Sequence, residues 1–212
     1  MSGPPSRELL ELAREEAQRT VNEQNQTLND IDTKAIKILR LNVLLIGTLL
    51  TIVSITLQSP DQFPRLETLI NSFTVLGAGM LLFSAALAAL TYTASTNQVG
   101  VSYDDMLTLT AGDDEYTDLQ ILDGLVVEGY ADWIKFNDKT NIINSLYITL
   151  TILTLIYAIS LFSLGIVAAS PFAMPWYGYV VLVAAIGGYT YLSGIKKQTD
   201  RYIEARDDHD GG

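Results

Sequence analysis

Two groups of neighbouring carboxylates are the side chains in this sequence best suited to chemistry. Asp104 and Asp105 form the first group, and Asp113, Asp114 and Glu115 form the second. Carboxylate oxygens are the ligands that hard divalent cations prefer. Both groups fall in a polar stretch, however, where a solvated loop and the cap of a following helix account for them. We therefore predict no metal site.

The other common catalytic patterns are absent from the sequence. It has no Cys, and its single His, His209, stands in an acidic tail. It contains no phosphate-binding glycine loop, no His-Glu-x-x-His pair and no Gly-x-Ser-x-Gly motif. The sequence therefore predicts a protein that is not an enzyme and that uses no cofactor.

Four apolar segments dominate the chain. They cover about residues 36–57, 69–92, 142–169 and 175–192. An α-helix needs about 20 apolar residues to cross the hydrocarbon core of a bilayer, and each segment is close to that length or exceeds it. We therefore predict an all-α fold, a bundle of four transmembrane helices.

The basic residues predict the orientation of these helices. Of the 13 Lys and Arg residues, only Arg65 lies between the first and second segments, and none lies between the third and fourth. Lys and Arg concentrate on the cytoplasmic side of membrane proteins. We therefore expect a plasma-membrane protein whose two termini and middle loop are cytoplasmic.

The predicted organisation has five parts. They are a cytoplasmic N-terminal helix (1–35), a transmembrane hairpin (36–92), a cytoplasmic loop (93–141) with an amphipathic helix near 114–137, a second hairpin (142–192), and a short cytoplasmic helix with an acidic tail (193–212).

The segment interiors contain no Asp, Glu, His, Lys or Arg, since Lys37 and Arg40 lie at the inner boundary of the first segment. Such residues normally mark proton and ion pathways, so a proton-coupled transporter is disfavoured. Asn42 and Asn71 are the strongest polar groups. The hydroxyls of the third segment are expected to form hydrogen bonds with the preceding helical turn. An oligomeric pore lined by Thr, Ser and backbone remains an alternative.

An apolar stripe is predicted along the N-terminal helix. Residues on one helical face recur at alternating spacings of three and four, and the stripe comprises Leu10, Ala13, Ala17, Val21, Gln24, Leu28, Ile31, Ala35 and Ile38. Because no Gly or Pro interrupts it, we expect this helix and the first transmembrane helix to be continuous.

The helix near 114–137 has a predicted docking face, formed by Leu122, Val126, Tyr130 and Trp133. We expect this face to meet the N-terminal helix or a separate protein partner. A position on the membrane surface is the alternative, but the carboxylates of this helix disfavour an anionic surface.

Small residues predict close helix contacts within the membrane, because they let helix backbones approach. The predicted packing residues are Gly77, Gly79, Ala85, Ala89, Ala184 and Gly188. They favour a tightly packed helix bundle, and we separately expect the protein to form a homo-oligomer surrounded by membrane lipid.

The net charge of −11 lies almost entirely on the cytoplasmic parts, because Asp61 and Glu67 are the only acidic residues on the predicted outer side. Such a surface repels nucleic acid, so we predict no nucleic-acid partner. The acidic, Lys-poor composition also predicts adaptation to high cytoplasmic salt, as in halophilic archaea.

Asp32-Thr33-Lys34-Ala35, directly before an apolar hairpin, resembles the start of the small membrane effectors of prokaryotic nucleotide-signalling defence systems, the Pycsar transmembrane and SLATT-type groups. The order of hairpin, cytoplasmic helix ending near residues 130–134 and further span is also similar, over about residues 28–168. The resemblance implies a protein that oligomerises and disrupts the inner membrane when a nucleotide signal arrives. It assigns no nucleotide-binding residue.

These observations predict a non-enzymatic, self-assembling membrane protein that perturbs the membrane or conducts across it under the control of its cytoplasmic helices. Asp32 and Lys34 are then expected to form a hinge pair at the membrane surface. The alternative is a scaffold or accessory subunit of another membrane complex.

Overall fold

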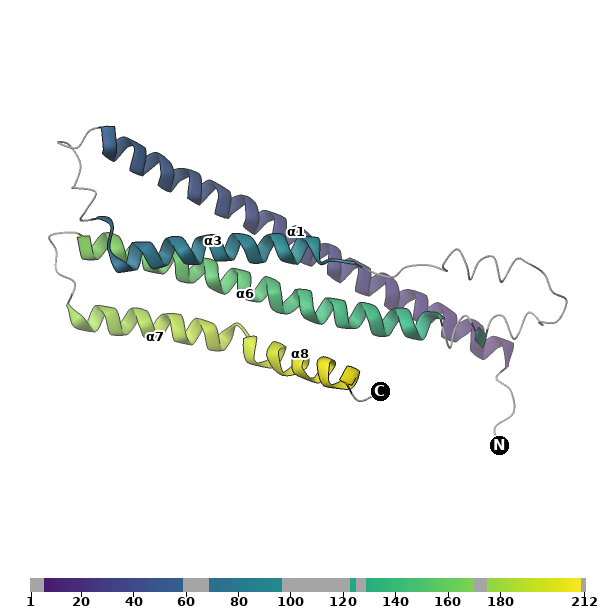
Figure 1. Cartoon of the computed structure of the whole chain (residues 1–212). Coiled ribbons are helices and arrows are strands. Elements are labelled where there is room, and N and C mark those ends of the chain that lie inside the picture. Colours follow the sequence, from purple (N-terminus) through teal and green to yellow (C-terminus); the bar gives the residue numbers. More distant parts are fainter. Residues whose placement is uncertain (1–5, 59–68, 97–122, 125–128, 170–174, 211–212) are drawn as a thin grey trace. The chain divides into compact units, whose positions relative to one another are not determined.

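The structure of the chain is a computed structural model that describes residues 6–58, 69–96, 123–124, 129–169 and 175–210. Its main helices are α1 (Arg7–Gln58), α3 (Ser72–Thr93), α6 (Ala131–Ala169), α7 (Trp176–Leu192) and α8 (Ile195–Asp210), shown in Figure 1. None of the described residues lies in a strand. The predicted all-α class is therefore confirmed.

The chain divides into two compact units. The first comprises Met1–Asp30 and Ser95–Ile142, and the second comprises Ile31–Ala94 and Ile143–Gly212. The helices α1 and α6 each contribute residues to both units. Each unit is described by itself below.

Three of the helices, α1, α3 and α6, are long and apolar enough to cross a membrane. They contain the first and third predicted segments and all but the first three residues of the second. The fourth predicted segment coincides with α7, a helix of 17 residues.

The helix α1 runs for 52 residues without interruption, so the predicted continuity of the arm with the first apolar segment is confirmed. It begins after Ser6, whose carbonyl oxygen accepts hydrogen bonds from the amides of Leu9 and Leu10. The predicted stripe is also confirmed. Its residues Leu10, Val21, Leu28, Ile31 and Ala35 are buried, and Ala13, Ala17, Gln24 and Ile38 are half-buried.

The start of α6 differs from the prediction. A cytoplasmic helix was expected to end near residue 137 and a separate span to begin at 142, but α6 is continuous from Ala131 to Ala169. The four residues from Asn137 to Thr140 are polar, yet they include no Gly or Pro that would break a helix. The sequence becomes polar at these four residues, but the helical backbone continues through them.

The helix α3 begins at Ser72, three residues later than the predicted start at Leu69. Asn71 caps it, because its side-chain oxygen accepts from the amides of Phe73 and Thr74, while the Thr74 hydroxyl accepts from the Asn71 amide. This reciprocal pattern satisfies amides that the first turn leaves free.

The core of the second unit lies where α1, α3 and α6 meet. One cluster joins Ile31 and Ala35 to Ile148, and a second joins Leu81 to Leu155 and Ala158. The residues of α1 that pack against the second cluster are Ile38, Leu45, Ile46 and Leu49. These contacts define the inner face of α1.

Candidate functional site

A buried polar junction links the three longest helices of the second unit. The side-chain amide of Asn42 on α1 donates to the hydroxyl oxygen of Ser84 on α3 at 3.1 Å. The Ser84 hydroxyl in turn donates to the backbone carbonyl of Thr151 on α6 at 3.0 Å. All three residues have an exposed fraction of 0%. Because the surroundings are apolar, these bonds fix the register of α1 against α3 and α6.

The junction is incompletely satisfied. The side-chain oxygen of Asn42 accepts no hydrogen bond from the described residues. A buried acceptor without a partner costs about 1–3 kcal/mol. The junction therefore selects one register of the helices at some cost in stability.

Close contact between α3 and α6 depends on two glycines. A Cβ atom on Gly77 would lie 3.2 Å from the carbonyl oxygen of Ala158, and one on Gly165 would lie 2.3 Å from Cγ2 of Thr74. The side-chain amide of Asn71 also donates to the Gly165 carbonyl at 2.9 Å. Of these two glycines, the sequence analysis named Gly77 and missed Gly165.

The other predicted packing residues differ in their exposure. Ala85 and Ala89 on α3 are half-buried. Gly79, Ala184 and Gly188 are exposed, and a Cβ atom on either glycine would meet nothing within 4 Å. Of the three predicted glycines, Gly77 is thus the one at which a Cβ atom would meet another helix of this chain.

The hydroxyls of α6 bond within their own helix, as the sequence analysis expected. Thr149, Thr151, Thr154 and Ser163 each donate to the carbonyl four residues earlier. Their hydrogen-bonding requirement is therefore met by the helix itself, so their presence alone does not indicate a pore.

The outer face of α1 carries a second stripe that the sequence analysis missed. Successive residues of an α-helix are rotated by about 100°, which places Gly47, Thr51, Ser54 and Gln58 on the side opposite the inner face defined above. All four residues are exposed. The most apolar window of α1 is only 6% buried, against 28% for α3 and 33% for α6.

In the first unit, Gln24 connects α1 to α6. Its side-chain amide donates to the carbonyl of Ile134, and its own carbonyl accepts from the side chain of Asn141, both at 3.1 Å. These two bonds join α6 to the N-terminal part of α1, but neither involves a residue of the predicted docking face. Of the predicted docking face, Tyr130 and Trp133 are half-buried and stack edge to face with ring centres 5.0 Å apart, whereas Leu122 and Val126 lie outside the described residues.

The predicted hinge pair lies within uninterrupted helix. Asp32 is half-buried and Lys34 is exposed, and α1 continues through both residues. Neither residue therefore marks a break in the backbone.

No group of three or more His, Cys, Asp or Glu residues within the described ranges could hold a metal ion. The two carboxylate groups of residues 104–105 and 113–115 lie outside those ranges.

Hydrogen bonds of the second unit also connect α6 to α7 and to the polar junction. Tyr157 on α6 bonds Thr190 on α7, and Thr151 on α6 is tied through Ser84 to Asn42. Lys196 lies six residues after Thr190, and Thr151 lies six residues before Tyr157. Lys196 follows the turn at Gly194 that separates α7 from α8, and Arg40 lies two residues before Asn42 of the junction.

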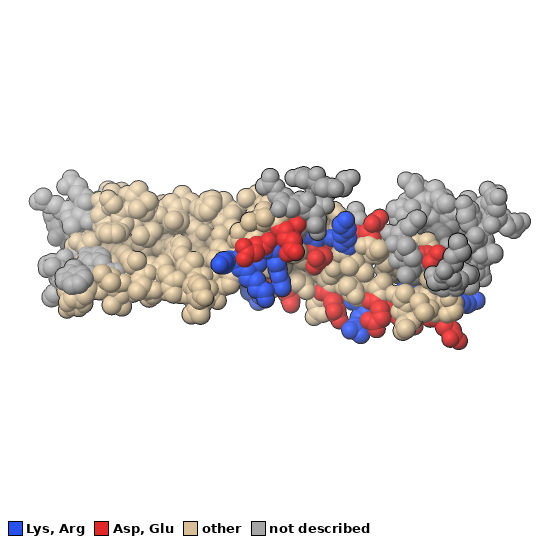
Figure 2. Space-filling view, turned by 90° about the horizontal axis from the view of Figure 1, so that it is seen from below, with Lys and Arg blue, Asp and Glu red and all other residues tan. Residues whose placement is uncertain are grey.

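Figure 2 shows a continuous tan area on the described part of the face in view, without Lys, Arg, Asp or Glu, that ends where basic and acidic side chains lie together. The comparisons with known proteins add nothing to this geometry, since no protein family, curated protein or solved structure matches the chain.

Proposed function

We propose that this protein is a non-enzymatic, multi-pass integral membrane protein that assembles with copies of itself through the outer face of α1. The assembly acts as a membrane-perturbing or channel-like effector, and the cytoplasmic helices control it. The observation that carries the proposal is the exposed stripe of Gly47, Thr51, Ser54 and Gln58 on the apolar part of α1.

Lipid does not require such a stripe. Leucine-rich surfaces suffice against acyl chains, whereas contacts between transmembrane helices are enriched in Gly, Ser and Thr and in side chains that bond across the contact. A Cβ atom on Gly47 would meet nothing within 4 Å, so a second helix has room to approach the backbone there. The Gln58 amide donates to the Ser54 hydroxyl and could exchange this bond for one to a neighbouring copy.

Four spans with cytoplasmic termini form part of the proposal. The 17 residues of α7 extend about 26 Å at 1.5 Å per residue, close to the roughly 30 Å of a bilayer core. Arg40 lies just before the apolar part of α1 and Lys196 lies just after α7, which supports an inner boundary at these ends because basic residues concentrate on the cytoplasmic side.

Control by the cytoplasmic helices is supported by the contacts of Gln24 with Ile134 and Asn141. These bonds hold the beginning of α6 against α1, and both helices continue into the second unit. A signal that separates them would act on helices that also form the polar junction. A nucleotide as that signal rests on the family resemblance alone.

Assembly is tested by placing a leucine on the proposed interface. Gly47→Leu adds bulk where the copies would meet, and Gly79→Leu adds the same side chain to open space on α3. We expect the first variant to form smaller species than the wild-type chain in lipid nanodiscs, and the second to keep the wild-type size. Equal sizes for all three proteins would contradict the proposed interface.

Flux of a trapped dye from liposomes tests the effector activity separately. Wild-type protein should release the dye, and Gly47→Leu should release it more slowly because assembly is impaired. If the wild-type protein assembles fully but the liposomes retain the dye, the proposed effector activity is wrong while the proposed assembly stands.

A second function is favoured by an exposed pair on the N-terminal part of α1. Leu9 and Leu12 are each 60% exposed, which suits docking of a protein partner to a scaffold or accessory subunit. Recovery of one stoichiometric partner with the wild-type chain, and its loss in a Leu9→Gln/Leu12→Gln variant, would support this function. The assembly proposal does not predict that loss.

A further inference from the structure

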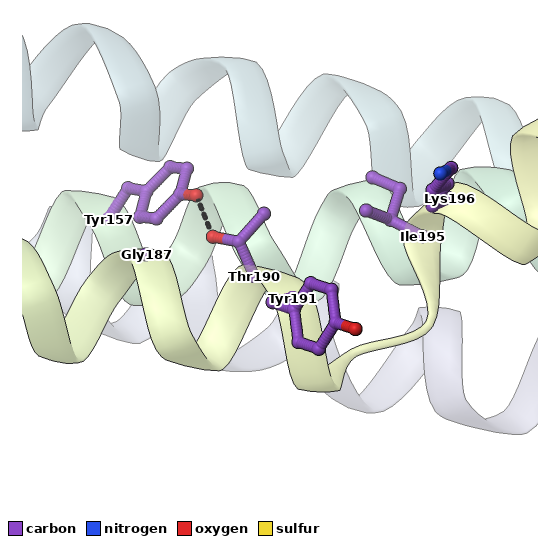
Figure 3. A pocket seen from close by; sticks show the side chains of 6 residues that line it. All are labelled: Tyr157, Gly187, Thr190, Tyr191, Ile195 and Lys196. Carbon is purple, nitrogen blue, oxygen red and sulfur yellow. Dashed lines mark hydrogen bonds between the residues drawn. The ribbon is translucent and has the colours of Figure 1, made fainter.

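An open hollow of about 500 Å³ lies beside the turn between α7 and α8. The residues that line it are Tyr157, Gly187, Thr190, Tyr191, Ile195 and Lys196. Figure 3 shows Tyr157 pointing from α6 towards Thr190, with Lys196 farther along at the start of α8. The volume lies within the range of about 300–1,000 Å³ that is usual for small-molecule sites.

Two of the hydroxyls that line the hollow, those of Tyr157 and Thr190, are already committed as donors. Thr190 donates its one hydroxyl hydrogen to the carbonyl of Ile186. In the bond between Tyr157 and Thr190, the tyrosine must therefore be the donor. The wall thus offers an apolar surface with no free hydroxyl hydrogen from either residue, and the ammonium group of Lys196 is the only cation among the described lining residues.

Lys196 lies where a lipid headgroup would be. It is exposed, it makes no ion pair with any described residue, and it lies four residues after the end of the apolar helix α7. The chain turns directly before it at Gly194, whose φ of 71° suits a glycine. This turn presents Lys196 at the end of an apolar hollow that continues along α7.

We propose that the hollow binds one anionic phospholipid of the cytoplasmic leaflet, with its phosphate on Lys196 and an acyl chain against Gly187 and Tyr157. This inference rests on the membrane insertion and orientation proposed above. The shared chemistry of a lipid headgroup and free phosphate is an anionic phosphoryl oxygen. The apolar wall favours the lipid, because free phosphate would gain a single cationic donor and no apolar contact.

Lipid binding by the full-length chain in detergent tests the proposal. The purified protein is mixed with phosphatidylglycerol and phosphatidylcholine, and the retained lipid is counted by native mass spectrometry. We expect the wild-type chain to retain phosphatidylglycerol selectively. Lys196→Gln should weaken that binding about tenfold, the usual scale for a charge-assisted hydrogen bond.

Lys197→Gln is the matched control, because Lys197 is the exposed neighbour with the same charge and does not line the hollow. It should retain phosphatidylglycerol as the wild-type chain does. Equal losses in the two variants would overturn the site and leave only general attraction of anionic lipid to basic residues.

The hollow itself is tested by filling it. Gly187→Leu enters open space and should abolish selective retention, whereas Gly188→Leu adds the same group to a neighbouring glycine outside the lining and should not. Retention by Gly187→Leu would overturn the proposal, as would full displacement of the lipid by inorganic phosphate. Flotation with phosphatidylcholine vesicles reports membrane insertion separately, so a failure of the lipid site is distinguishable from a failure of the proposed function.

Discussion

Replacement of Gly165 by alanine should loosen the contact between α3 and α6. The new Cβ atom would lie 2.3 Å from Cγ2 of Thr74, 3.1 Å from the Thr74 amide nitrogen and 3.2 Å from the side-chain oxygen of Asn71. No ordinary contact is as short as the first of these distances. The helices must separate locally, and the cap that Asn71 and Thr74 form on α3 must move with them.

The magnitude follows from the cost of overpacking. Excess volume in a well-packed interior typically destabilises by about 1–3 kcal/mol. The side-chain amide of Asn71 also loses its alignment with the Gly165 carbonyl, a bond of 2.9 Å worth about 0.6 kcal/mol in a membrane interior. We expect Gly165→Ala to lower the free energy of unfolding by about 2 kcal/mol, within the range that overpacking sets.

The shortest contact can be removed independently. Thr74→Ser deletes Cγ2 but keeps the hydroxyl that bonds the Asn71 amide, so it should recover about half of the loss in the Gly165→Ala background. Gly47→Ala is the control, because its Cβ atom meets nothing within 4 Å. Stability is measured by unfolding in mixed micelles, followed by far-UV circular dichroism. Equal stabilities of the Gly165→Ala and Gly47→Ala variants would refute the packing argument.

Three further predictions concern the polar contacts and the charge. Ser84→Ala leaves the amide of Asn42 without its acceptor and should lower the free energy of unfolding by about 1 kcal/mol. Adding Asn42→Leu should restore the stability. A double variant no more stable than Ser84→Ala would contradict the role of the junction. Asn141→Leu removes the bond to the Gln24 carbonyl and should speed amide hydrogen exchange in the first unit roughly fivefold, with unchanged exchange as the contrary result. Raising the KCl concentration should raise the melting temperature, because salt screens repulsion within a chain of net charge −11; a melting temperature independent of salt would speak against this.

The periodic features of the fold were accessible from the sequence. The stripe from Leu10 to Ile38 was predictable because a helix must bury residues at spacings of three and four, and every member is buried or half-buried. The boundary between 137 and 142 was predicted from polarity, which does not end a helix when the residues themselves tolerate helical backbone.

The contacts between helices were less accessible. Gly165 is critical because it faces Thr74, and that pairing depends on how far two helices slide along each other, which local sequence does not encode. Ser84 likewise cannot be distinguished from the other hydroxyl residues by sequence alone. Its role becomes visible only in its hydrogen bond with Asn42. The outer stripe of α1 could have been recognised in the sequence, because Gly47, Thr51, Ser54 and Gln58 have helical spacing. It was missed because the residues around it are mostly apolar.

Disulfide crosslinking along α1 tests self-assembly most directly, and the absence of Cys from the chain makes single substitutions unambiguous. Thr51→Cys and Ser54→Cys lie on the proposed interface, while Ile52→Cys and Val53→Cys lie on exposed positions off the stripe. After mild oxidation in native membranes, the first two variants should form covalent dimers and the second two should stay monomeric. Crosslinking that is absent at all four positions, or equal among them, would contradict assembly through this face.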